Sequence, residues 1–306
     1  MYEVEDKYRM VKSMIEKIRY KDHEDWLNLR KSGIGGSEAG IVMGISEYGS
    51  PLTVWSDKMG IGKPVEANLA MKMGNYLEPL VAAEFMERTG KKVQERHYMM
   101  KNTKYPWAIA NIDRKIVGEN AILECKTTGS IPRIRAFRQG EYPDEWYCQV
   151  QHYMAVGGFE RAYLACIARN MQGEYMDWVI PRDDEFIKVL MEKEEALWDR
   201  VMQQIPPDPN GNDREKDVLF ELFNAKEELS IDITGSMDLV EQYKDYAKLE
   251  KQYKQMKDAA KNAICMAMGD AVVGLSNGEK VCSWKVQTRK EHVVGESTSR
   301  VFRLNV

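Results

Sequence analysis

The feature that most constrains this chain is a pair of apolar segments separated by a short polar break, over residues 108–128. The first segment reads Ala-Ile-Ala-Asn-Ile-Asp-Arg-Lys-Ile-Val, the break contains Gly118, and the second reads Ala-Ile-Leu-Glu-Cys-Lys-Thr-Thr. Two such runs around a glycine predict a β-hairpin. A turn centred just after Gly118 would place Asp113 directly opposite Glu124. Because side chains alternate along a strand, Lys126 would lie on the same face as Glu124.

Two carboxylates and an ammonium would then share one patch of sheet. Carboxylate oxygens suit a hard cation such as Mg²⁺, and a neighbouring ammonium can orient a water or offset the charge of a phosphate. Asp113, Glu124 and Lys126 therefore predict metal-assisted phosphodiester hydrolysis. The alternative is a solvated charged pair on the wet face of a strand. Against it, residues 121–123 predict a buried strand, in which charges need a partner.

The composition predicts an ordinary soluble globular protein. Of its 306 residues, 30% are charged and 43% are hydrophobic, which suits one large or two modest domains. No apolar run approaches the roughly 18 residues of a membrane span, and the charged N-terminal residues do not resemble a secretory signal. We therefore expect a cytoplasmic protein that makes no membrane contact. The scattered cysteines form no C-x-x-C pair and the histidines are isolated, which argues against disulfide frameworks, zinc sites and iron–sulfur clusters.

The net charge of −4 argues against indiscriminate binding of nucleic acid, but it leaves room for a local basic channel. Lys126, Arg133, Arg135 and Arg138 fall in a stretch that contains no acidic residue. A solvated loop and a contact surface for a nucleic-acid backbone are both open explanations of this stretch.

Apolar spacing and turn residues predict an alternation of helices and strands in the first two-thirds of the chain. Helices are expected over residues 1–31, 74–88, 143–157 and 183–201, with a short helix after the glycine-rich residues 32–40. Strands are expected over residues 91–100, 108–117, 121–128, 162–168 and 174–180. The proline-rich residues 206–212 predict a linker between a domain at 1–210 and a C-terminal region at 213–306.

The C-terminal region predicts one long helix followed by a hairpin. Apolar residues recur at a 3-4 spacing from Leu239 to Ala267, which indicates a single packing seam. We expect this seam to pack against its own domain, with an intermolecular coiled coil as the alternative. Residues 271–286 predict a β-hairpin that turns at Asn277-Gly278.

Several short motifs occur in a recognisable order: Trp26-x-x-Leu29-Arg30 with Gly36-Ser37-Glu38, Gly74-x-x-x-Glu78, Asp113, Glu124-Cys125-Lys126, and Gln149-x-Gln151. This order resembles the PD-(D/E)xK nuclease superfamily and, more narrowly, the phage λ-exonuclease and YqaJ-type viral recombinase family, across about residues 24–205. The resemblance implies an α/β core with a restriction-endonuclease-like central mixed sheet flanked by helices. The C-terminal helix and hairpin would then be an appendage of unknown role.

The resemblance also implies a site for two Mg²⁺ ions, for which Mn²⁺ could substitute. Asp113, Glu124 and the backbone carbonyl of Cys125 would be metal ligands. Glu78 matches a helical glutamate that lies near the metals in the family and would be a further ligand and catalytic residue, the alternative being an exposed acid on a helix.

Two further residues of the implied site act on water. Lys126 would position or activate the attacking water, and Gln149 matches a glutamine that lies near that water in the family. Gln151 points elsewhere on the same helix and is expected to be structural.

Arg30 and Ser37 match an arginine and a serine that hold a terminal 5′-phosphate in the family. The glycines before Ser37 would leave backbone N–H groups free at a helix start, which favours an anion, and Arg30 can hold a phosphate bidentately. The alternatives are a plain N-cap for Ser37 and a surface salt bridge for Arg30. Asn111 stands where a relative has a phosphate-contacting serine, while Ile112 and Arg114 replace the proline and glycine usual beside the aspartate.

The activity implied by the resemblance is Mg²⁺-dependent 5′ to 3′ exonuclease digestion of double-stranded DNA ends. The products would be 3′ single-stranded tails for phage-type recombination, in the cytoplasm of a bacterial host and from a phage or prophage gene. The implied partners are a single-strand annealing protein and further copies of the chain in a homotrimer. Two alternatives stay open: an endonuclease of the same fold in repair or defence, and a catalytically inactive DNA-binding or scaffolding protein.

Overall fold

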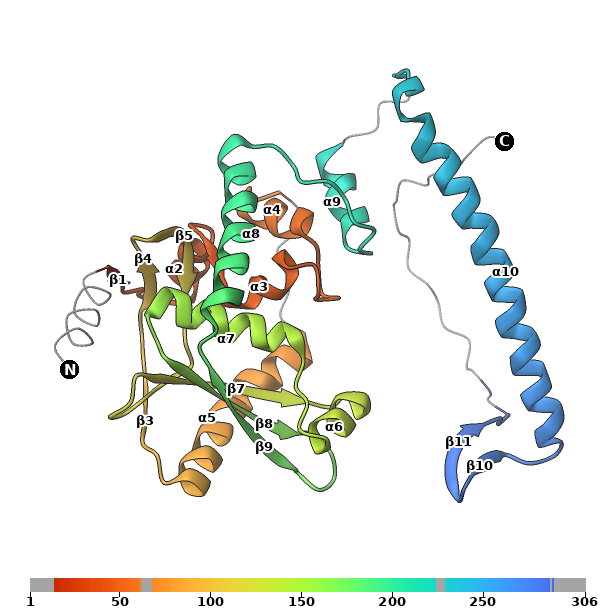
Figure 1. The fold of residues 1–306 in the computed structure, drawn as a ribbon, viewed down its shortest axis with the longest axis horizontal. Helices are drawn as coiled ribbons and strands as arrows, with labels where there is room; N and C mark the ends of the chain where they lie inside the picture. The colour runs from red at the N-terminus through yellow and green to blue at the C-terminus, as the bar shows by residue number, and fades with distance from the viewer. Residues whose placement is uncertain (1–13, 62–67, 224–228, 287, 289–306) are drawn as a thin grey trace. The chain divides into compact units, whose positions relative to one another are not determined.

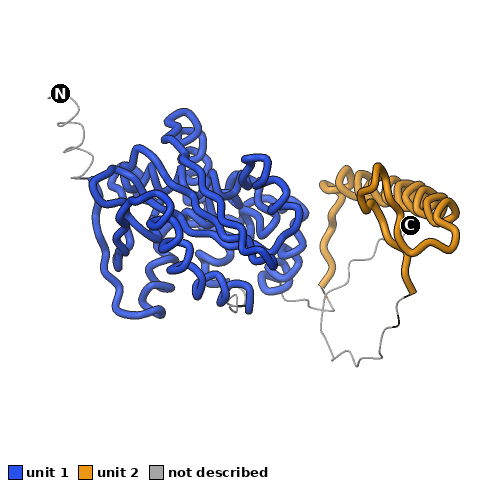
Figure 2. The backbone as a smooth tube through the Cα atoms, turned by 90° about the horizontal axis from the view of Figure 1, so that it is seen from below, with its two compact units in different colours: residues 1–224 blue, residues 225–306 orange. Residues whose placement is uncertain are grey.

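The computed structural model of the protein describes residues 14–61, 68–223, 229–286 and 288. It forms two compact units, Met1–Asn224 and Ala225–Val306 (Figure 2). The boundary lies later than the proline-rich segment that suggested it. Helix α9 (Glu215–Leu222) belongs to the first unit, where Val218 is buried in an apolar cluster with Leu52 and Trp55. No helix among the described residues combines the length and apolar character that a membrane crossing requires.

The described part of the first unit is built on two mixed sheets (Figure 1). The larger has the order β3 (Val93–Glu95), β6 (Arg114–Ile116), β7 (Ala121–Thr128), β8 (Arg161–Ala168) and β9 (Tyr175–Pro181). In it, β7 and β8 are parallel and the other neighbours are antiparallel. The smaller has the order β1 (Ile15–Ile18), β4 (Met99–Asn102), β5 (Tyr105–Ala110) and β2 (Ile34–Gly35). The predicted strand over residues 91–100 is therefore divided between two sheets.

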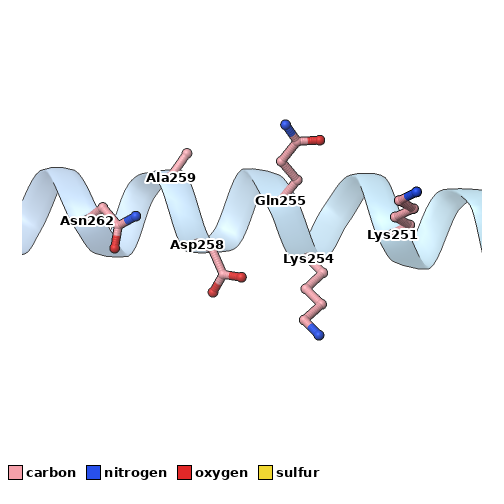
Figure 3. A pocket seen from close by; sticks show the side chains of 6 residues that line it. All are labelled: Lys251, Lys254, Gln255, Asp258, Ala259 and Asn262. Carbon is pink, nitrogen blue, oxygen red and sulfur yellow. The ribbon is translucent and has the colours of Figure 1, made fainter.

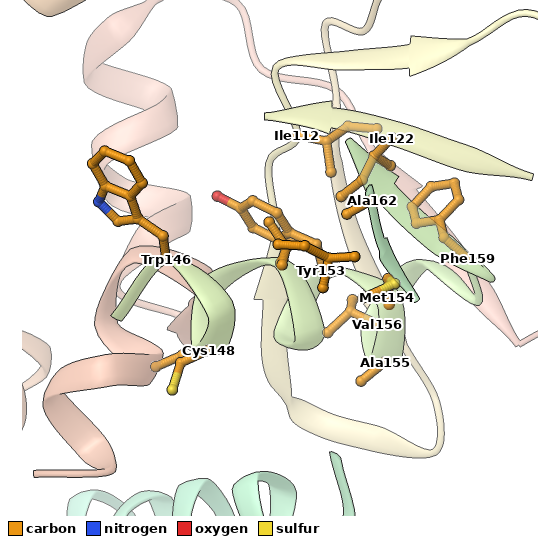
Figure 4. Packing of buried hydrophobic residues seen from close by; sticks show 14 of the residues in the cluster. Ile112, Ile122, Trp146, Cys148, Tyr153, Met154, Ala155, Val156, Phe159 and Ala162 are labelled. Carbon is orange, nitrogen blue, oxygen red and sulfur yellow. The ribbon is translucent and has the colours of Figure 1, made fainter. Parts of the chain in front are cut away.

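Helices cover both faces of the larger sheet, as predicted (Figure 1). Helix α5 (Leu69–Thr89) packs Val81 and Phe85 against one face, where Leu123 is buried. Helix α7 (Asp144–Gly157) packs on the other face, where Met154 lies close to Ile122 and Ala162 (Figure 4). Because side chains alternate along β7, the residues with even numbers face α7 and those with odd numbers face α5.

The remaining helices of this unit lie around the two sheets (Figure 1). They are α2 (His23–Arg30), α3 (Gly36–Val42), α4 (Pro51–Lys58), α6 (Ile131–Arg138) and α8 (Asp184–Gln203). The predicted ends are confirmed where a cap defines them. Asp183 accepts a hydrogen bond from the Phe186 N–H at the start of α8, while α5 and α7 end at Gly90 and Gly158 in left-handed backbone.

The predicted helix over residues 1–31 is wrong for part of its length. Residues 1–13 lie outside the described residues, and Ile15–Ile18 form strand β1, paired antiparallel with β4. Apolar residues three apart fit a helix, but short isoleucine-rich runs also suit a strand when a partner is available.

The second unit contains a short 3₁₀ turn, η1 (Thr234–Ser236), the long helix α10 (Met237–Met268), and the hairpin of β10 (Val273–Ser276) and β11 (Glu279–Ser283). The predicted hairpin turn is confirmed at Asn277-Gly278, where both residues have positive φ. No residue of α10 is buried, so the seam does not pack against its own domain among the described residues. Figure 3 shows a polar stretch of this helix, with Lys254 and Asp258 on one side and Gln255 on another.

Candidate active site

The hairpin of β6 and β7 brings Asp113 beside Glu124. Arg114 pairs with Leu123 and Lys115 with Ile122, so the next pair in this register is Asp113 and Glu124. Asp113 lies just before β6, and its Oδ2 accepts a hydrogen bond of 2.8 Å from the backbone N–H of Cys125. The register predicted from the position of Gly118 is confirmed.

Glu124, Lys126 and Gln149 form a closed triangle of hydrogen bonds on the α7 face. Lys126 Nζ lies 2.8 Å from Glu124 Oε1 and donates to Gln149 Oε1 at 2.8 Å. Gln149 Nε2 donates to Glu124 Oε1 at 2.7 Å. It also lies 3.0 Å from the Tyr153 hydroxyl, one turn further along α7. The two strand residues are thus on one face, as predicted, and α7 supplies the third member.

Burial and like charge dominate the electrostatics of this cluster. Burial, then the charges of Glu124 and Glu78, raise the pKa of Asp113 well above its ordinary value. Burial also raises the pKa of Glu124, although Lys126 opposes this. For Lys126, burial alone would lower the pKa, but the two neighbouring acids reverse this and raise it. The cluster therefore holds an ammonium beside two acids, and the charge of Glu124 makes ionisation of Asp113 less favourable.

The donors present fit a divalent cation. Glu124 Oε2 is buried and has no hydrogen-bond partner, which leaves a hard oxygen donor unused beside a second acid. Among the described residues, no three side chains of His, Cys, Asp or Glu converge as a metal-binding group. Mg²⁺ commonly takes only one or two protein carboxylates and completes its shell with water and phosphate oxygens. Asp113 and Glu124 match that pattern, with the Cys125 carbonyl as a predicted further ligand.

Glu78 reaches the same region from α5, but its carboxylate is already paired. Arg114 Nη1 donates to Glu78 at 2.6 Å and to the Asp113 carbonyl oxygen at 2.7 Å. The charge of Glu78 acts on both acids of the cluster, while its role as a metal ligand stays a prediction. Burial raises the pKa of the Cys125 thiol well above its ordinary value, in keeping with a packing role for that side chain.

Arg30 and Ser37 lie together, as predicted. Arg30 Nη2 donates to Ser37 Oγ at 3.2 Å and lies 3.3 Å from the carboxylate of Glu38. The N-cap of α3 is Gly35 rather than Ser37, and the Gly35 N–H donates to Glu38 at 2.7 Å. The prediction that this N–H would be free for an anion is therefore wrong.

The other predicted DNA-contacting residues occupy separate positions. Asn111 Oδ1 accepts a hydrogen bond from Tyr20. The three arginines of the basic stretch lie on helix α6 rather than in a loop; Arg135 is exposed there, and Arg138 donates to Glu174 at 2.9 Å. Arg133 alone approaches the cluster, as described next.

Arg133 is linked to the cluster through an aromatic ring. It donates to Glu145 at 2.7 Å, and its guanidinium lies 5.7 Å from the centre of the Trp146 ring. Lys126 Nζ lies 5.9 Å from the same ring. Two half-buried cations thus lie within cation–π range of the Trp146 ring.

Two residues of this region were missed from the sequence: Lys58 and Trp146. Tyr153 follows Gln149 by one helical turn and so shares its face of α7. Lys58 carried no local signal, since its partner Glu38 lies on another helix. Gln151 donates to the Pro181 carbonyl and accepts from the Asp183 N–H, which accords with the structural role expected for it.

Comparisons with known proteins agree with the geometry. Residues 25–160 match the YqaJ-like viral recombinase domain. The chain is 34% identical over 271 residues to the uncharacterized protein YqaJ of Bacillus subtilis (strain 168), covering 86% of this chain and 83% of that protein. Its fold is similar to the crystal structures of the alkaline exonuclease LHK-Exo from Laribacter hongkongensis, alone and in complex with dAMP. For each, the TM-score is 0.52 at 21% identity, over 59% of this chain and 93% of that chain. The predicted α/β core is confirmed, and the chain belongs to the YqaJ-like viral recombinase family.

Proposed function

We propose that this protein is a Mg²⁺-dependent deoxyribonuclease that digests double-stranded DNA from its ends in the 5′ to 3′ direction. The observation that carries this proposal is the pair formed by the half-buried Asp113 and the buried Glu124 beside Lys126, with one Glu124 oxygen left without a partner. Two further facts support it: the family is that of viral recombinases, and the fold is similar to that of a protein named an alkaline exonuclease.

The chemistry is divided among the residues of the cluster. A bound divalent cation would acidify a coordinated water and stabilise charge on the phosphate. Asp113 and Glu124 would hold it, since their oxygens are hard donors in a buried setting. Lys126, kept protonated by its acidic neighbours, offers N–H donors to a phosphate oxygen or to the attacking water. Gln149 holds both Lys126 and Glu124 in place and can orient that water.

The 5′ to 3′ direction of digestion would come from the pair of Arg30 and Ser37. A guanidinium beside a hydroxyl can grip a terminal 5′-phosphate, and this pair lies on α2 and α3 of the same unit as the cluster. Holding the new 5′ end after each cleavage would make digestion proceed from that end and leave a 3′ single-stranded tail. Replacing Arg30 with Ala should then reduce digestion of 5′-phosphorylated ends more than digestion of 5′-hydroxyl ends. An equal loss on both would remove the end-recognition role.

The proposed setting is phage-type recombination in a bacterial cytoplasm. There, a single-strand annealing protein would coat the tail, and further copies of the chain would assemble with this one around DNA. Both partners are parts of the proposal that follow from the resemblance to the λ-exonuclease family.

One assay tests the proposal against its nearest rival. Linear duplex DNA with a label at each 5′ end, and covalently closed circular duplex, are incubated with Mg²⁺ or with EDTA. We expect loss of the linear substrate with Mg²⁺ only, while the circle stays intact. Cleavage of the circle would support the endonuclease alternative instead. Failure to digest either DNA with Mg²⁺ or Mn²⁺ would contradict the nuclease proposal and favour a binding or scaffolding protein.

A further inference from the structure

A second cation lies close to Arg30 and belongs to none of the sequence motifs of the candidate site. Lys58, the last residue of α4, has a side chain with no exposed surface, and its Nζ lies 2.8 Å from the carboxylate of Glu38. The same Nζ donates at 2.9 Å to the carbonyl oxygen of Arg30, the last residue of α2. Lys58 therefore ties together the acid and the backbone that surround the Arg30 guanidinium.

Glu38 is shared between the two cations and is oriented by a third donor. Its carboxylate lies 3.3 Å from Arg30 Nη2 and accepts a 2.7 Å hydrogen bond from the Gly35 N–H. Burial alone would raise the pKa of Glu38, but Lys58, Arg30 and that N–H reverse this and lower it. Glu38 is thus an anion held in one orientation, with its shorter side-chain contact to Lys58 rather than to Arg30.

The exposure of the two cations differs in a way that assigns them different tasks. The Arg30 side chain is 30% exposed, whereas that of Lys58 is fully buried. Arg30 can therefore reach an external anion, and Lys58 cannot. With both cations present, the group of two cations and one anion keeps a net positive charge. Without Lys58, Arg30 and Glu38 would form a neutral pair, and an incoming phosphate would have to compete with Glu38 for the guanidinium.

We propose that Lys58 is a positioning residue for recognition of a terminal phosphate: by holding Glu38, it keeps the Arg30 guanidinium available to a 5′-phosphorylated DNA end. This inference rests on the end-recognition part of the proposed function and deepens it. The bland alternative is that the Lys58 and Glu38 pair only braces α4 against α3. The two explanations differ in what they require. A brace requires the contact between Lys58 and Glu38 itself. An available Arg30 guanidinium requires only that the group around it keeps a net positive charge.

The test is binding in EDTA, where no metal-dependent cleavage occurs, of two blunt duplexes that differ only in a 5′-phosphate or a 5′-hydroxyl. The quantity compared is the ratio of the two dissociation constants for the full-length chain. Lys58→Met should reduce this preference for phosphate about tenfold or more, to the level of Arg30→Ala, since one charge-assisted contact is lost. The double variant Lys58→Met/Glu38→Gln restores the charge balance and should restore most of the preference. Lys193→Met, at an exposed position on α8, is the matched control.

Three results would overturn the inference: no preference of the wild type for the phosphate, an unchanged preference in Lys58→Met, or no recovery of the preference in the folded double variant. If Lys58→Met does not fold, as judged by thermal unfolding, the phosphate preference of the double variant is compared with that of Arg30→Ala instead. A wild type that prefers the phosphorylated end but digests no DNA would contradict the proposed nuclease while leaving this inference standing.

Discussion

The Asp113 carboxylate accepts a hydrogen bond of 2.8 Å from the backbone N–H of Cys125. This bond joins the residue before β6 to the middle of β7, so Asp113 is fixed beside Glu124 rather than free to turn toward solvent. The half-buried Asp113 and the buried Glu124 are thereby held close together, and the charge of Glu124 raises the cost of ionising Asp113. The protein keeps this repulsion in its native state, which is the behaviour expected of a cation site rather than of a salt bridge evolved for stability.

The first prediction follows from that repulsion. Mg²⁺ should raise the thermal midpoint of the protein, because a ligand that binds only the native state stabilises it by about 2.7 kcal/mol at a hundredfold excess over its Kd. Asp113→Asn should abolish most of this shift, measured by thermal unfolding with Mg²⁺ and with EDTA. Asp199→Asn, at an exposed position on α8, should leave the shift unchanged. Equal shifts in wild type and Asp113→Asn would argue against a cation held by this acid.

The second prediction concerns the contact between α3 and α7. A Cβ added at Gly36 would lie 2.4 Å from the ring of Tyr153, which is itself buried and hydrogen-bonded to Gln149. Gly36→Ala should therefore destabilise the protein by about 1–3 kcal/mol through overpacking. It should also impair catalysis, since the ring cannot shift without moving its contact to Gln149. Urea unfolding and a digestion assay measure the two effects.

Gly74→Ala is the matched control for this substitution. Gly74 lies inside α5 with nothing within 4 Å of the added Cβ. Alanine favours a helix over glycine by roughly 1 kcal/mol, so this variant should be neutral or more stable. If both alanine variants behaved alike, the close approach of α3 to Tyr153 would not be the cause.

A third prediction comes from a fully buried pair away from the cluster. His152 Nδ1 lies 2.8 Å from Glu194 Oε1, and Nε2 lies 2.9 Å from the Ile109 carbonyl oxygen. Both ring nitrogens thus face acceptors. Burial alone would lower the pKa of His152, but Glu194 and this carbonyl reverse that and raise it above 6.5. The native state then binds a proton more tightly than the unfolded state, so the stabilisation is complete below 6.5 and is lost as the pH rises through the raised value.

Glu194→Gln tests this sign. Removing one partner of a buried ion pair costs about 3–5 kcal/mol, and this loss should be largest at about pH 6 and smaller at about pH 8.5. Urea unfolding at both pH values gives the comparison. Glu195→Gln, an exposed neighbour on the same helix, should change stability by no more than about 0.5 kcal/mol at either pH. A Glu194→Gln loss that does not depend on pH would mean that the imidazole is not charged in the native state.

The core of the candidate site was predictable because it rests on local patterns. The turn at Gly118 sets the register of the hairpin, and strand alternation then places Glu124 and Lys126 on one face. Gln149 could be placed on the facing helix by its motif. Its bonds to Glu124 and Lys126, however, depend on α7 lying across β7 and β8, which is a tertiary fact.

What could not be predicted depends on partners distant in sequence. Ile15–Ile18 become a strand only because β4 lies beside them. Lys58 is a buried cation only because α2, α3 and α4 meet around Glu38. In the second unit, the 3-4 spacing correctly predicts the helix, but spacing alone does not say what the seam contacts, and Tyr246 and Tyr253 are each 66% exposed.

The central claim is tested most directly by the rate at which linear 5′-phosphorylated duplex is digested with Mg²⁺ by the wild type, Lys126→Ala and Glu124→Gln. Each variant removes one corner of the triangle closed by Gln149. We expect each rate to fall by at least about 10²–10³-fold, with the far-ultraviolet circular dichroism unchanged and Lys193→Ala as active as the wild type. Digestion at the wild-type rate by either folded variant would contradict the assignment of this cluster as the nuclease site.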